Sequence, residues 1–387
     1  MGHKREVDVV IVGAGPAGIG TALALKQVGI DAVILDAGRV GASFLGWPAE
    51  MRLITPSFHS NPFLQPDLNA IQPDTSPADL LGVEHLSGEQ YAAYLQAVVD
   101  YYLLWVREYE KVTGIEPVDS GFVVHREGAD PLAARQVIWA GGEFQRPRIP
   151  AIPGVANGLH TASVEAWADV EGDDFVIVGG YESGIDAAYH LGMRGKRVTV
   201  LSTDEPWQRD DPDPSVSLSP YTRERLLQLI DEHGERIRLI GDAEVVAVHP
   251  DDEGFAIETR GGERYTTPCP PYFATGFHSA LEPVKALFAW ENDQPRFTEN
   301  DESTLHPGLY YAGPSLVHRD SKFCFIYKFR ARFGVIARTI ADRLGRAHDG
   351  LQHYAARGFL IDDLACCVDC RCALTEKENS ETASTTP

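Results

Sequence analysis

Residues 7–36 read VDVVIVGAGPAGIGTALALKQVGIDAVILD, and this stretch decides the fold. Residues 7–12 are apolar and rich in β-branched side chains, as is typical of a strand buried in a parallel sheet. The glycine pattern Gly13-x-Gly15-x-x-Gly18 follows and opens a helical pattern over residues 19–28. A second apolar run, residues 32–35, ends at Asp36. This order predicts a strand–helix–strand unit that begins at residue 7.

Each glycine of this motif has a physical role in holding a dinucleotide. Gly13 allows the tight turn out of the strand, Gly15 lets a pyrophosphate approach the backbone, and Gly18 lets the helix pack closely on the strand. The helix N-terminus presents free N–H groups to the phosphates. Asp36 lies where an acidic side chain bonds the ribose hydroxyls. The alternative is a glycine-rich turn without a ligand, but five features in register favour a nucleotide site.

Composition limits the classes of partner. The 387 residues give room for two or three domains. The net charge of −22 argues against nucleic acid and anionic membrane surfaces as partners. The chain starts without a signal-peptide pattern, and no apolar run approaches the roughly 20 residues of a membrane helix. We therefore expect a cytoplasmic protein that acts on a small-molecule substrate, and a homodimer is left open.

The opening stretch resembles the FAD-binding start of two-dinucleotide-domain flavoproteins, a class that includes disulfide reductases and flavin-containing monooxygenases. The resemblance implies an α/β fold with two Rossmann-like domains, the NAD(P)-type domain being inserted into the FAD domain. It also implies domain limits of 1–155 and 271–350 for FAD, 156–270 for NAD(P), and 351–387 for a cysteine-rich tail. The FAD contacts it implies in this stretch are Gly13, Gly15, Pro16, Ala17, Gly18 and Asp36.

A long loop, residues 38–79, follows the first unit and lacks clear periodicity. Long loops inside compact domains are usually functional. This loop resembles the segment over the flavin ring in flavin-containing-monooxygenase-like proteins, which implies that Trp47, Arg52 and Thr55 lie near the isoalloxazine, with Arg52 as a catalytic candidate. The alternative is a structural loop in which Trp47 and Leu53 fill a core. After it, Ser87 and Gln90 predict a capped helix whose aromatic stripe, from Tyr91 to Trp105, packs in the core.

Later segments complete the resemblance to the FAD domain. Ala140 and Gly141 stand at the A-T-G-G hinge of the superfamily, with Gly141 where Thr is usual. Residues 272–277 match the return strand. Gly313 matches the late flavin-binding segment, where Pro314 replaces the usual Asp and Ser315 is a candidate substitute. The helix expected over residues 325–344 would then direct its N-terminus at the flavin.

A second nucleotide unit begins with the apolar strand 175–178. The superfamily binds NAD(P)H here, which implies contacts from Gly179, Gly180, Ser183, Gly184 and Ser202. Tyr181, however, takes the place of the second glycine, and a Cβ there obstructs the pyrophosphate. Three alternatives stay open: a widened turn with Tyr181 stacked on the cofactor, weak binding, or a unit that has lost its cofactor. The absence of an acid at Ser202 favours NADPH over NADH, and the candidate phosphate partners are Arg194, Lys196, Arg197 and Arg209.

Four cysteines crowd into the seven residues 366–372. One interpretation is a dithiol, Cys367 and Cys370, that carries electrons between flavin and a disulfide, with Arg371 favouring the thiolate. Another is metal binding by Cys366, Cys367, Cys370 and Cys372, and a third is a tail of ordinary thiols. Cys269 and Cys324 are isolated, and we expect them to be buried.

The motifs fix the reaction less well than the fold. The nucleotide domain lacks the C-x-x-C of thioredoxin reductases, and Ala17 replaces the Cys typical of bacillithiol-disulfide-reductase-type proteins. The monooxygenase fingerprint is also absent, because Gly154 and His160 are wrongly spaced for it. We expect an FAD oxidoreductase that takes hydride from NADPH, with a monooxygenase-like reaction first and disulfide reduction next. A flavin- or metal-binding sensor without turnover is the third hypothesis.

Overall fold

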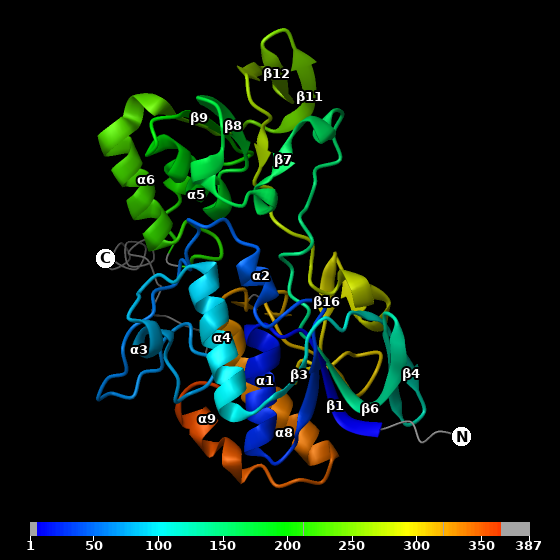
Figure 1. Ribbon diagram of the computed structural model, residues 1–387. Helices are drawn as coiled ribbons and strands as arrows, with labels where there is room; N and C mark the ends of the chain where they lie inside the picture. The colour runs from blue at the N-terminus through cyan, green and yellow to red at the C-terminus, as the bar shows by residue number, and fades with distance from the viewer. Residues whose placement is uncertain (1–5, 212, 320, 365–387) are drawn as a thin grey trace, which may run out of the picture.

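The computed structural model describes residues 6–211, 213–319 and 321–364, which form two lobes (Figure 1). The first lobe carries both ends of the described chain, and the second is formed by the middle of the chain. The helices of the first lobe are α1 (Pro16–Gln27), α2 (Ala42–Leu45), α3 (Pro77–Leu81), α4 (Gly88–Tyr102), α7 (Ile326–Phe329), α8 (Phe333–Arg343) and α9 (Gln352–Ala356). Those of the second lobe are α5 (Glu182–Gly192) and α6 (Pro220–His233).

The main sheet of the first lobe has a parallel core. Its order is β3-β2-β1-β6-β5-β4, and β17 pairs with the last residues of β6. The strands β3, β2, β1, β6 and β17 run parallel, whereas β5 and β4 form an antiparallel extension. The strands are β1 (Glu6–Val12), β2 (Ala32–Leu35), β3 (Trp105–Arg107), β4 (Val112–Val118), β5 (Gly121–Arg126), β6 (Ala129–Trp139) and β17 (Leu309–Tyr311).

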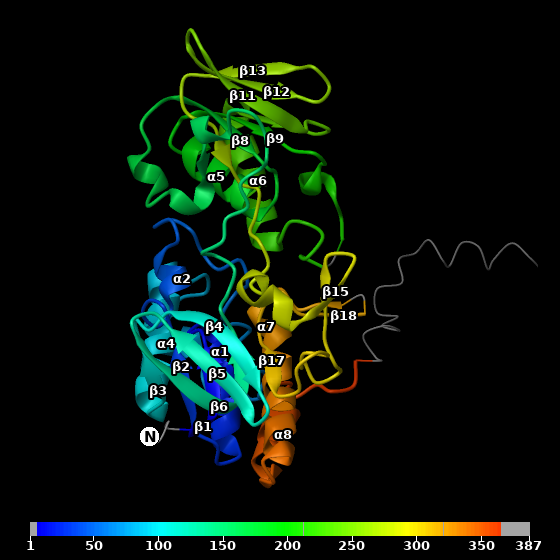
Figure 2. The same cartoon turned by 90° about the vertical axis from the view of Figure 1, so that its right-hand side faces the viewer.

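The second lobe repeats this plan with a parallel sheet of order β10-β9-β8-β14-β7. An antiparallel sheet, β11-β12-β13, caps the end that faces away from the first lobe (Figure 2). The strands are β7 (Leu159–His160), β8 (Asp174–Val178), β9 (Arg197–Leu201), β10 (Ile237–Ile240), β11 (Val245–Asp251), β12 (Gly254–Thr259), β13 (Arg264–Thr267) and β14 (Tyr272–Phe273). Two short ribbons, β15 (Ala289–Glu291) with β16 (Gln294–Arg296) and β18 (Val317–His318) with β19 (Ser321–Lys322), follow.

The predicted fold class is confirmed. Two β-α-β units, β1-α1-β2 and β8-α5-β9, each open a parallel sheet, and the second lies in the chain between β6 and β17 of the first. The apolar residues 9–12, 32–35 and 175–178 of the inner strands are buried, as continuous apolar runs in a covered parallel sheet require. The edge strand β10 is covered less, and its Arg238 is exposed. Within the described part of the chain, no helix is both long and apolar enough to cross a membrane.

Two predicted helices differ from the structure. The capping box of Ser87 and Gln90 is present, and Tyr91 and Tyr94 are buried as expected. The helix ends at Tyr102, however, because Leu103 adopts a left-handed conformation with φ 53°, and Trp105 lies in the edge strand β3 with 49% of its surface exposed. The prediction that Trp105 continues the core stripe was wrong.

The helix expected over residues 325–344 is divided into α7 and α8 by a tighter turn at Arg330–Arg332. Both arginines are buried there. Arg330 donates to the Ala70 carbonyl over 2.9 Å, and Arg332 pairs with the fully buried carboxylate of Asp301 over 2.9 Å. His318 contacts the same carboxylate. The turn therefore places two charged side chains inside the lobe, which the periodicity of the sequence does not reveal.

We predict that Arg332→Met lowers the free energy of unfolding by about 3–5 kcal/mol, because it leaves the buried Asp301 carboxylate without its cation. Arg338→Met on the same stretch is the matched control, since Arg338 pairs with Asp362 at the surface and should cost less than about 1 kcal/mol. Denaturant unfolding of both variants measures the difference. Equal losses of unfolding free energy in the two variants would show that the buried Arg332–Asp301 pair stabilises the fold no more than the surface pair does.

Candidate functional site

The glycine turn after β1 has the geometry of a dinucleotide cradle. Gly13 has φ +114°, and a Cβ on it would lie 2.2 Å from the Ala140 carbonyl oxygen. A Cβ on Gly18 would lie 1.9 Å from the Gly13 oxygen. Gly15 is the N-cap of α1, and a Cβ there would meet no protein atom within 4 Å. Packing therefore explains Gly13 and Gly18, whereas Gly15 leaves open space over the helix N-terminus, where a phosphate binds.

Asp36 follows β2 and holds the same turn. Its carboxylate accepts the Ala14 N–H over 2.6 Å and the Gly38 N–H over 2.8 Å. Burial raises the pKa of Asp36, and the two N–H donors partly oppose that shift. The carboxylate thus lies at the carboxyl edge of the sheet beside the cradle, in the position predicted for a ribose partner.

The other predicted FAD residues of the first lobe gather at this edge. Ala140 donates its N–H to the Val12 carbonyl over 2.8 Å, and Ala312 donates to the Trp139 carbonyl over 3.0 Å, so the ends of β1, β6 and β17 adjoin. A Cβ on Gly141 would lie 3.0 Å from the Trp139 ring, so a larger residue at this position would require the ring to shift. The residues brought together are Gly13, Gly15, Pro16, Ala17, Gly18, Asp36, Ala140, Gly141, Gly313 and Pro314. The open space over Gly15 fits a flavin dinucleotide, and these contacts stay predictions.

Ser315, the candidate substitute for the missing Asp, is tied to the protein. Its N–H donates to the Tyr311 hydroxyl over 2.9 Å, and its Oγ accepts the Ala280 N–H over 3.2 Å. These bonds fasten the turn after β17 to the chain that returns from the second lobe.

The long loop reaches from the first lobe to the second. Trp47 packs on Phe44 with ring centroids 4.9 Å apart, and the Thr55 carbonyl accepts the Asn69 amide. Arg52 donates to the Ala49 and Met51 carbonyls over 2.8 and 2.9 Å. Its side chain lines an open cavity of about 400 Å³ between the lobes, together with Glu50, Tyr189, His190, Arg194, Tyr221 and Arg225. The structure thus sets Arg52 against α5 and α6, and a role at the flavin ring stays a prediction.

Contacts at this cavity join the lobes. Glu50 accepts the N–H groups of Trp167 and Ala168 over 2.8 and 2.7 Å and pairs with Arg194 over 2.9 Å. His85 stacks on Tyr221 with ring centroids 4.0 Å apart. The loop of the first lobe is therefore also a docking element for the second.

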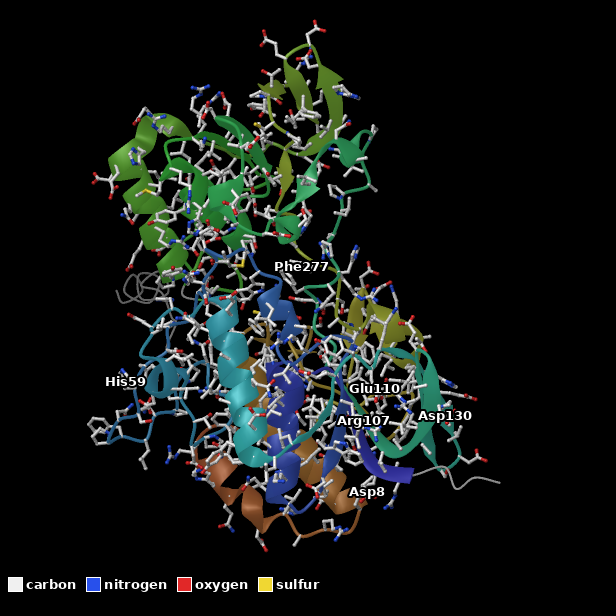
Figure 3. All side chains as sticks on the ribbon, in the orientation of Figure 1. Asp8, His59, Arg107, Glu110, Asp130 and Phe277 are labelled. Atoms are coloured by element: carbon white, nitrogen blue, oxygen red, sulfur yellow. The ribbon has the colours of Figure 1, made fainter. Side chains whose placement is uncertain are left out.

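The two chain crossings between the lobes form a paired hinge. Arg148 donates its N–H to the Gly276 carbonyl over 2.9 Å, and His278 donates to the Arg146 carbonyl over 2.8 Å. Phe277 lies at this junction (Figure 3), where its ring contacts Phe144 and His160. The hinge holds the return segment beside the segment that follows β6.

Glu143, in the hinge, is a titratable group that the sequence interpretation missed. It is half-buried, and burial raises its pKa to about 7, with Arg148 opposing the shift. It is close enough to Tyr311, at the end of β17, to raise the pKa of that phenol further. A lone acidic residue after three small hinge residues was the signal available in the sequence.

The second nucleotide unit repeats the backbone of the first. Gly179 has φ +111°, and a Cβ on Gly184 would lie 1.9 Å from the Gly179 oxygen, as in the first turn. Tyr181 is the N-cap of α5 with φ −90° and ψ −164°, compared with −91° and −173° at Gly15. Its side chain therefore lies over the N-terminus of α5, in the space that corresponds to the open space over Gly15 in the first unit. With Tyr181 in this position, the unit does not fit the pyrophosphate of a nicotinamide dinucleotide.

The basic candidates for the 2′-phosphate are already paired. Arg194 pairs with Glu50, Lys196 with Asp173, Arg197 with Asp174 and Arg209 with Asp204. Ser202, at the end of β9, donates its hydroxyl to Asp204 over 3.2 Å. Gly180 lies in the turn, where a Cβ on it would come within 3.0 Å of the Ser202 side chain, and Ser183 and Gly184 lie in the first turn of α5.

The thiols give limited information. Cys366, Cys367, Cys370 and Cys372 lie outside the described residues. Cys269 and Cys324 are half-buried, so the prediction that they are buried was wrong. The Cys324 sulfur lies 3.0 Å from the Ser215 hydroxyl. Among the described residues, no group of three or more His, Cys, Asp or Glu side chains is arranged to hold a metal ion.

Comparison with known proteins identifies relatives over most of the chain. Residues 10–313 match the family described as pyridine nucleotide-disulphide oxidoreductase. Bacilliredoxin reductase Bdr of Bacillus subtilis is 26% identical over 351 residues, which cover 87% of this chain and 98% of that protein. The bacillithiol disulfide reductase structure from Staphylococcus aureus has a TM-score of 0.72 and 25% identity, covering 87% of this chain and 99% of the other. A flavin-containing monooxygenase from Stenotrophomonas maltophilia shares the fold, with a TM-score of 0.67, 17% identity and coverage of 88% and 99%.

We predict that Gly15→Ala weakens FAD binding at least tenfold, about 1.4 kcal/mol, without destabilising the FAD-free protein. The added methyl meets no protein atom and the backbone there suits any residue, so the only group it obstructs is the ligand. Gly114→Ala is the control, since its Cβ would meet only the His125 ring at 3.9 Å. Isothermal titration of the apoprotein with FAD measures both. Unchanged FAD affinity in Gly15→Ala would show that the glycine turn after β1 does not bind FAD.

We also predict that Glu143→Gln stabilises the folded protein, relative to wild type, by an amount that grows with pH. Because the folded carboxyl has a pKa near 7 and the unfolded one about 4.3, the folded chain binds more protons between these values, and stability falls as pH rises through this window. The substitution removes this loss, so the melting temperature of the variant relative to wild type should rise from pH 5 to pH 8. Glu127→Gln, an exposed carboxylate paired with Lys111, should show no such trend. A difference independent of pH would contradict the assignment.

Proposed function

Because this chain belongs to the pyridine nucleotide-disulphide oxidoreductase family, we propose that it transfers two electrons from NADPH to a disulfide by means of bound FAD. The overall reaction consumes one NADPH, one proton and one disulfide, and it yields NADP⁺ and two thiols. The family and the relatives establish a flavin oxidoreductase, and the choice of disulfide as acceptor is the step that we add.

One observation carries this proposal: the similarity to disulfide reductases extends over nearly their whole length. Both of these relatives are 25–26% identical to this chain and are covered to 98% or more. The monooxygenase structure, at 17% identity, indicates the shared fold alone. We therefore place disulfide reduction ahead of the monooxygenase-like reaction expected from the loop pattern.

In this proposal, some groups of the chain bind FAD and others orient the second lobe. The turn of Gly13, Gly15 and Gly18 would hold the FAD pyrophosphate, and Asp36 would accept the ribose hydroxyls. The flavin supplies the two-electron chemistry when bound. The paired hinge and the Glu50 contacts hold the second lobe against the first.

The thiol that meets the substrate is assigned to the tail. Ala17 stands where bacillithiol-disulfide-reductase-type proteins resemble one another in having Cys, so the first turn cannot supply a thiol. Cys269 and Cys324 lie in different lobes, and their sulfurs contact Glu171 and Ser215 rather than each other. The pair Cys367 and Cys370 has the C-x-x-C spacing that forms an exchangeable disulfide. We therefore propose these two thiols as the relay from flavin to substrate.

NADPH is proposed over NADH because the ribose position carries Ser202 where an NADH site carries an acid. The nearby carboxylate of Asp204 is neutralised by Arg209. If a 2′-phosphate displaced the Asp204 carboxylate from Arg209, the Arg209 guanidinium could pair with the phosphate instead.

A monooxygenase-like reaction is the second candidate, and Ala17 is the observation that favours it. A flavin site without an adjacent thiol suits oxygen as the acceptor better than a disulfide. This reaction would require O₂ and would not depend on the tail cysteines.

We predict that the FAD-loaded protein reduces cystine or oxidised glutathione with NADPH under anaerobic conditions, and that Cys370→Ser lowers this turnover at least tenfold. Reduction of the flavin by NADPH should persist in the variant, because the lost thiol acts after the flavin. Thiol release and NADPH absorbance measure the two steps.

Cys269→Ser is the matched control and should keep full turnover, since its sulfur contacts a backbone carbonyl of the second lobe. Full disulfide turnover in Cys370→Ser would refute the thiol relay. NADPH oxidation that requires O₂ and releases no thiol would instead support oxygenation.

A further inference from the structure

We propose that Tyr181 and the segment 213–219 occupy the pyrophosphate site of the second nucleotide unit, and that NADPH binds only after both are displaced. Tyr181 thereby sets the affinity of the chain for its electron donor. The inference rests on the proposed function to the extent that it takes a pyridine nucleotide as donor.

The two nucleotide turns have equivalent backbones. Gly15 and Tyr181 are both N-caps of the helix after the first strand, and their φ values differ by 1°. At Gly15 the direction of a Cβ leads into open space over the N–H groups of the helix. At Tyr181 the same direction is taken by a phenol ring. A pyrophosphate at the second turn would therefore collide with this ring, unless the ring moves.

The Tyr181 ring is held in place by hydrogen bonds and packing. The Tyr181 hydroxyl lies 2.6 Å from the Pro214 carbonyl oxygen and 2.7 Å from the Ser217 carbonyl oxygen, with which it shares its proton. The half-buried ring packs against the cluster of Ile185, Leu218 and Leu226. The side chain is thus part of a packed, hydrogen-bonded structure rather than a freely rotating group.

The segment 213–219 is held by groups from three directions. Arg209 donates to the Val216 carbonyl over 3.0 Å, and Glu182, the first residue of α5, accepts the Ser219 N–H over 2.5 Å. From the first lobe, Lys328 on α7 donates to Asp213 over 2.7 Å and to the Ser215 hydroxyl over 2.8 Å. These groups fix the segment between the N-terminus of α5 and the first lobe.

The charge at this helix end also differs between the two units. The first helical residue is Pro16 in the first turn and Glu182 in the second. The Glu182 carboxylate is satisfied by Ser219 and Thr222, so it belongs to the closed arrangement. An anion normally gains from a helix N-terminus, but here a carboxylate of the chain already lies in the first turn. The second unit is therefore built to be closed in the absence of nucleotide.

The consequence is a reduced apparent affinity. When only a fraction of the molecules is open, the apparent dissociation constant rises by the inverse of that fraction. Removal of the ring and its hydroxyl should raise the open fraction and tighten binding. Because Lys328 fastens the segment from the first lobe, loss of the Lys328–Asp213 pair should also favour the open form.

The test compares NADPH affinity in FAD-loaded wild type and Tyr181→Gly, with no disulfide present. NADP⁺ titration by calorimetry measures binding directly, because NADP⁺ cannot pass electrons to the flavin. We expect the dissociation constant to fall at least tenfold in Tyr181→Gly, and to fall by a smaller factor in Tyr181→Phe, which keeps the ring but loses the hydroxyl. Tyr101→Phe, at an exposed position on α4, is the control and should leave affinity unchanged.

Hydrogen exchange gives a second measurement that does not depend on turnover. Amides of 215–217 and 219 are bonded to Asp213 or Glu182 in the closed form, so their exchange in wild type should accelerate when NADP⁺ binds. Equal or weaker affinity in Tyr181→Gly would overturn the inference, since it would mean that the ring supports the nucleotide. Unchanged or slower exchange on binding would overturn it as well. The proposed function fails on a separate measurement, the transfer of electrons from NADPH to a disulfide.

Discussion

A phosphate can bind at a helix N-terminus only where no side chain covers the backbone N–H groups, and the architecture of this protein depends on that constraint. The first unit satisfies it with Gly15, above which lies open space. The second unit has the same turn, and Tyr181 fills the equivalent space. The two turns thus share one backbone conformation but differ in access. The first is open to a dinucleotide, and the second is closed by a side chain of the protein.

The closed turn belongs to the contact between the lobes. Lys328 of α7 binds Asp213 in the segment that holds Tyr181, while Glu50 of the long loop binds the backbone of the second lobe on another side. The paired hinge around Phe277 also joins the lobes. Displacement of Tyr181 together with the segment 213–219, as we propose, would separate Lys328 from Asp213, so donor binding would act on a contact between the lobes.

Much of the fold could be predicted from the sequence because local signals were strong. Buried apolar strands flanked by glycine turns identified both units, and the capping box of Ser87 located the start of α4. The predictions that were wrong concern features that depend on contacts with residues distant in the sequence. The end of α4 before Trp105 follows from a left-handed Leu103, and the break before α8 follows from Arg332 meeting a carboxylate 31 residues away in sequence. At the site, Tyr181 stood out as a departure from the glycine pattern, but its hold on Pro214 and Ser217, and the elevated pKa of Glu143, arise from burial and tertiary contacts.

The most direct test of this account is a crystal structure of the FAD-loaded protein with NADP⁺ bound. The account predicts the FAD pyrophosphate over Gly15, and the NADP⁺ pyrophosphate over the N-terminus of α5 with Tyr181 turned out and its bonds to Pro214 and Ser217 broken. NADP⁺ bound at the second turn while Tyr181 keeps both bonds would contradict it.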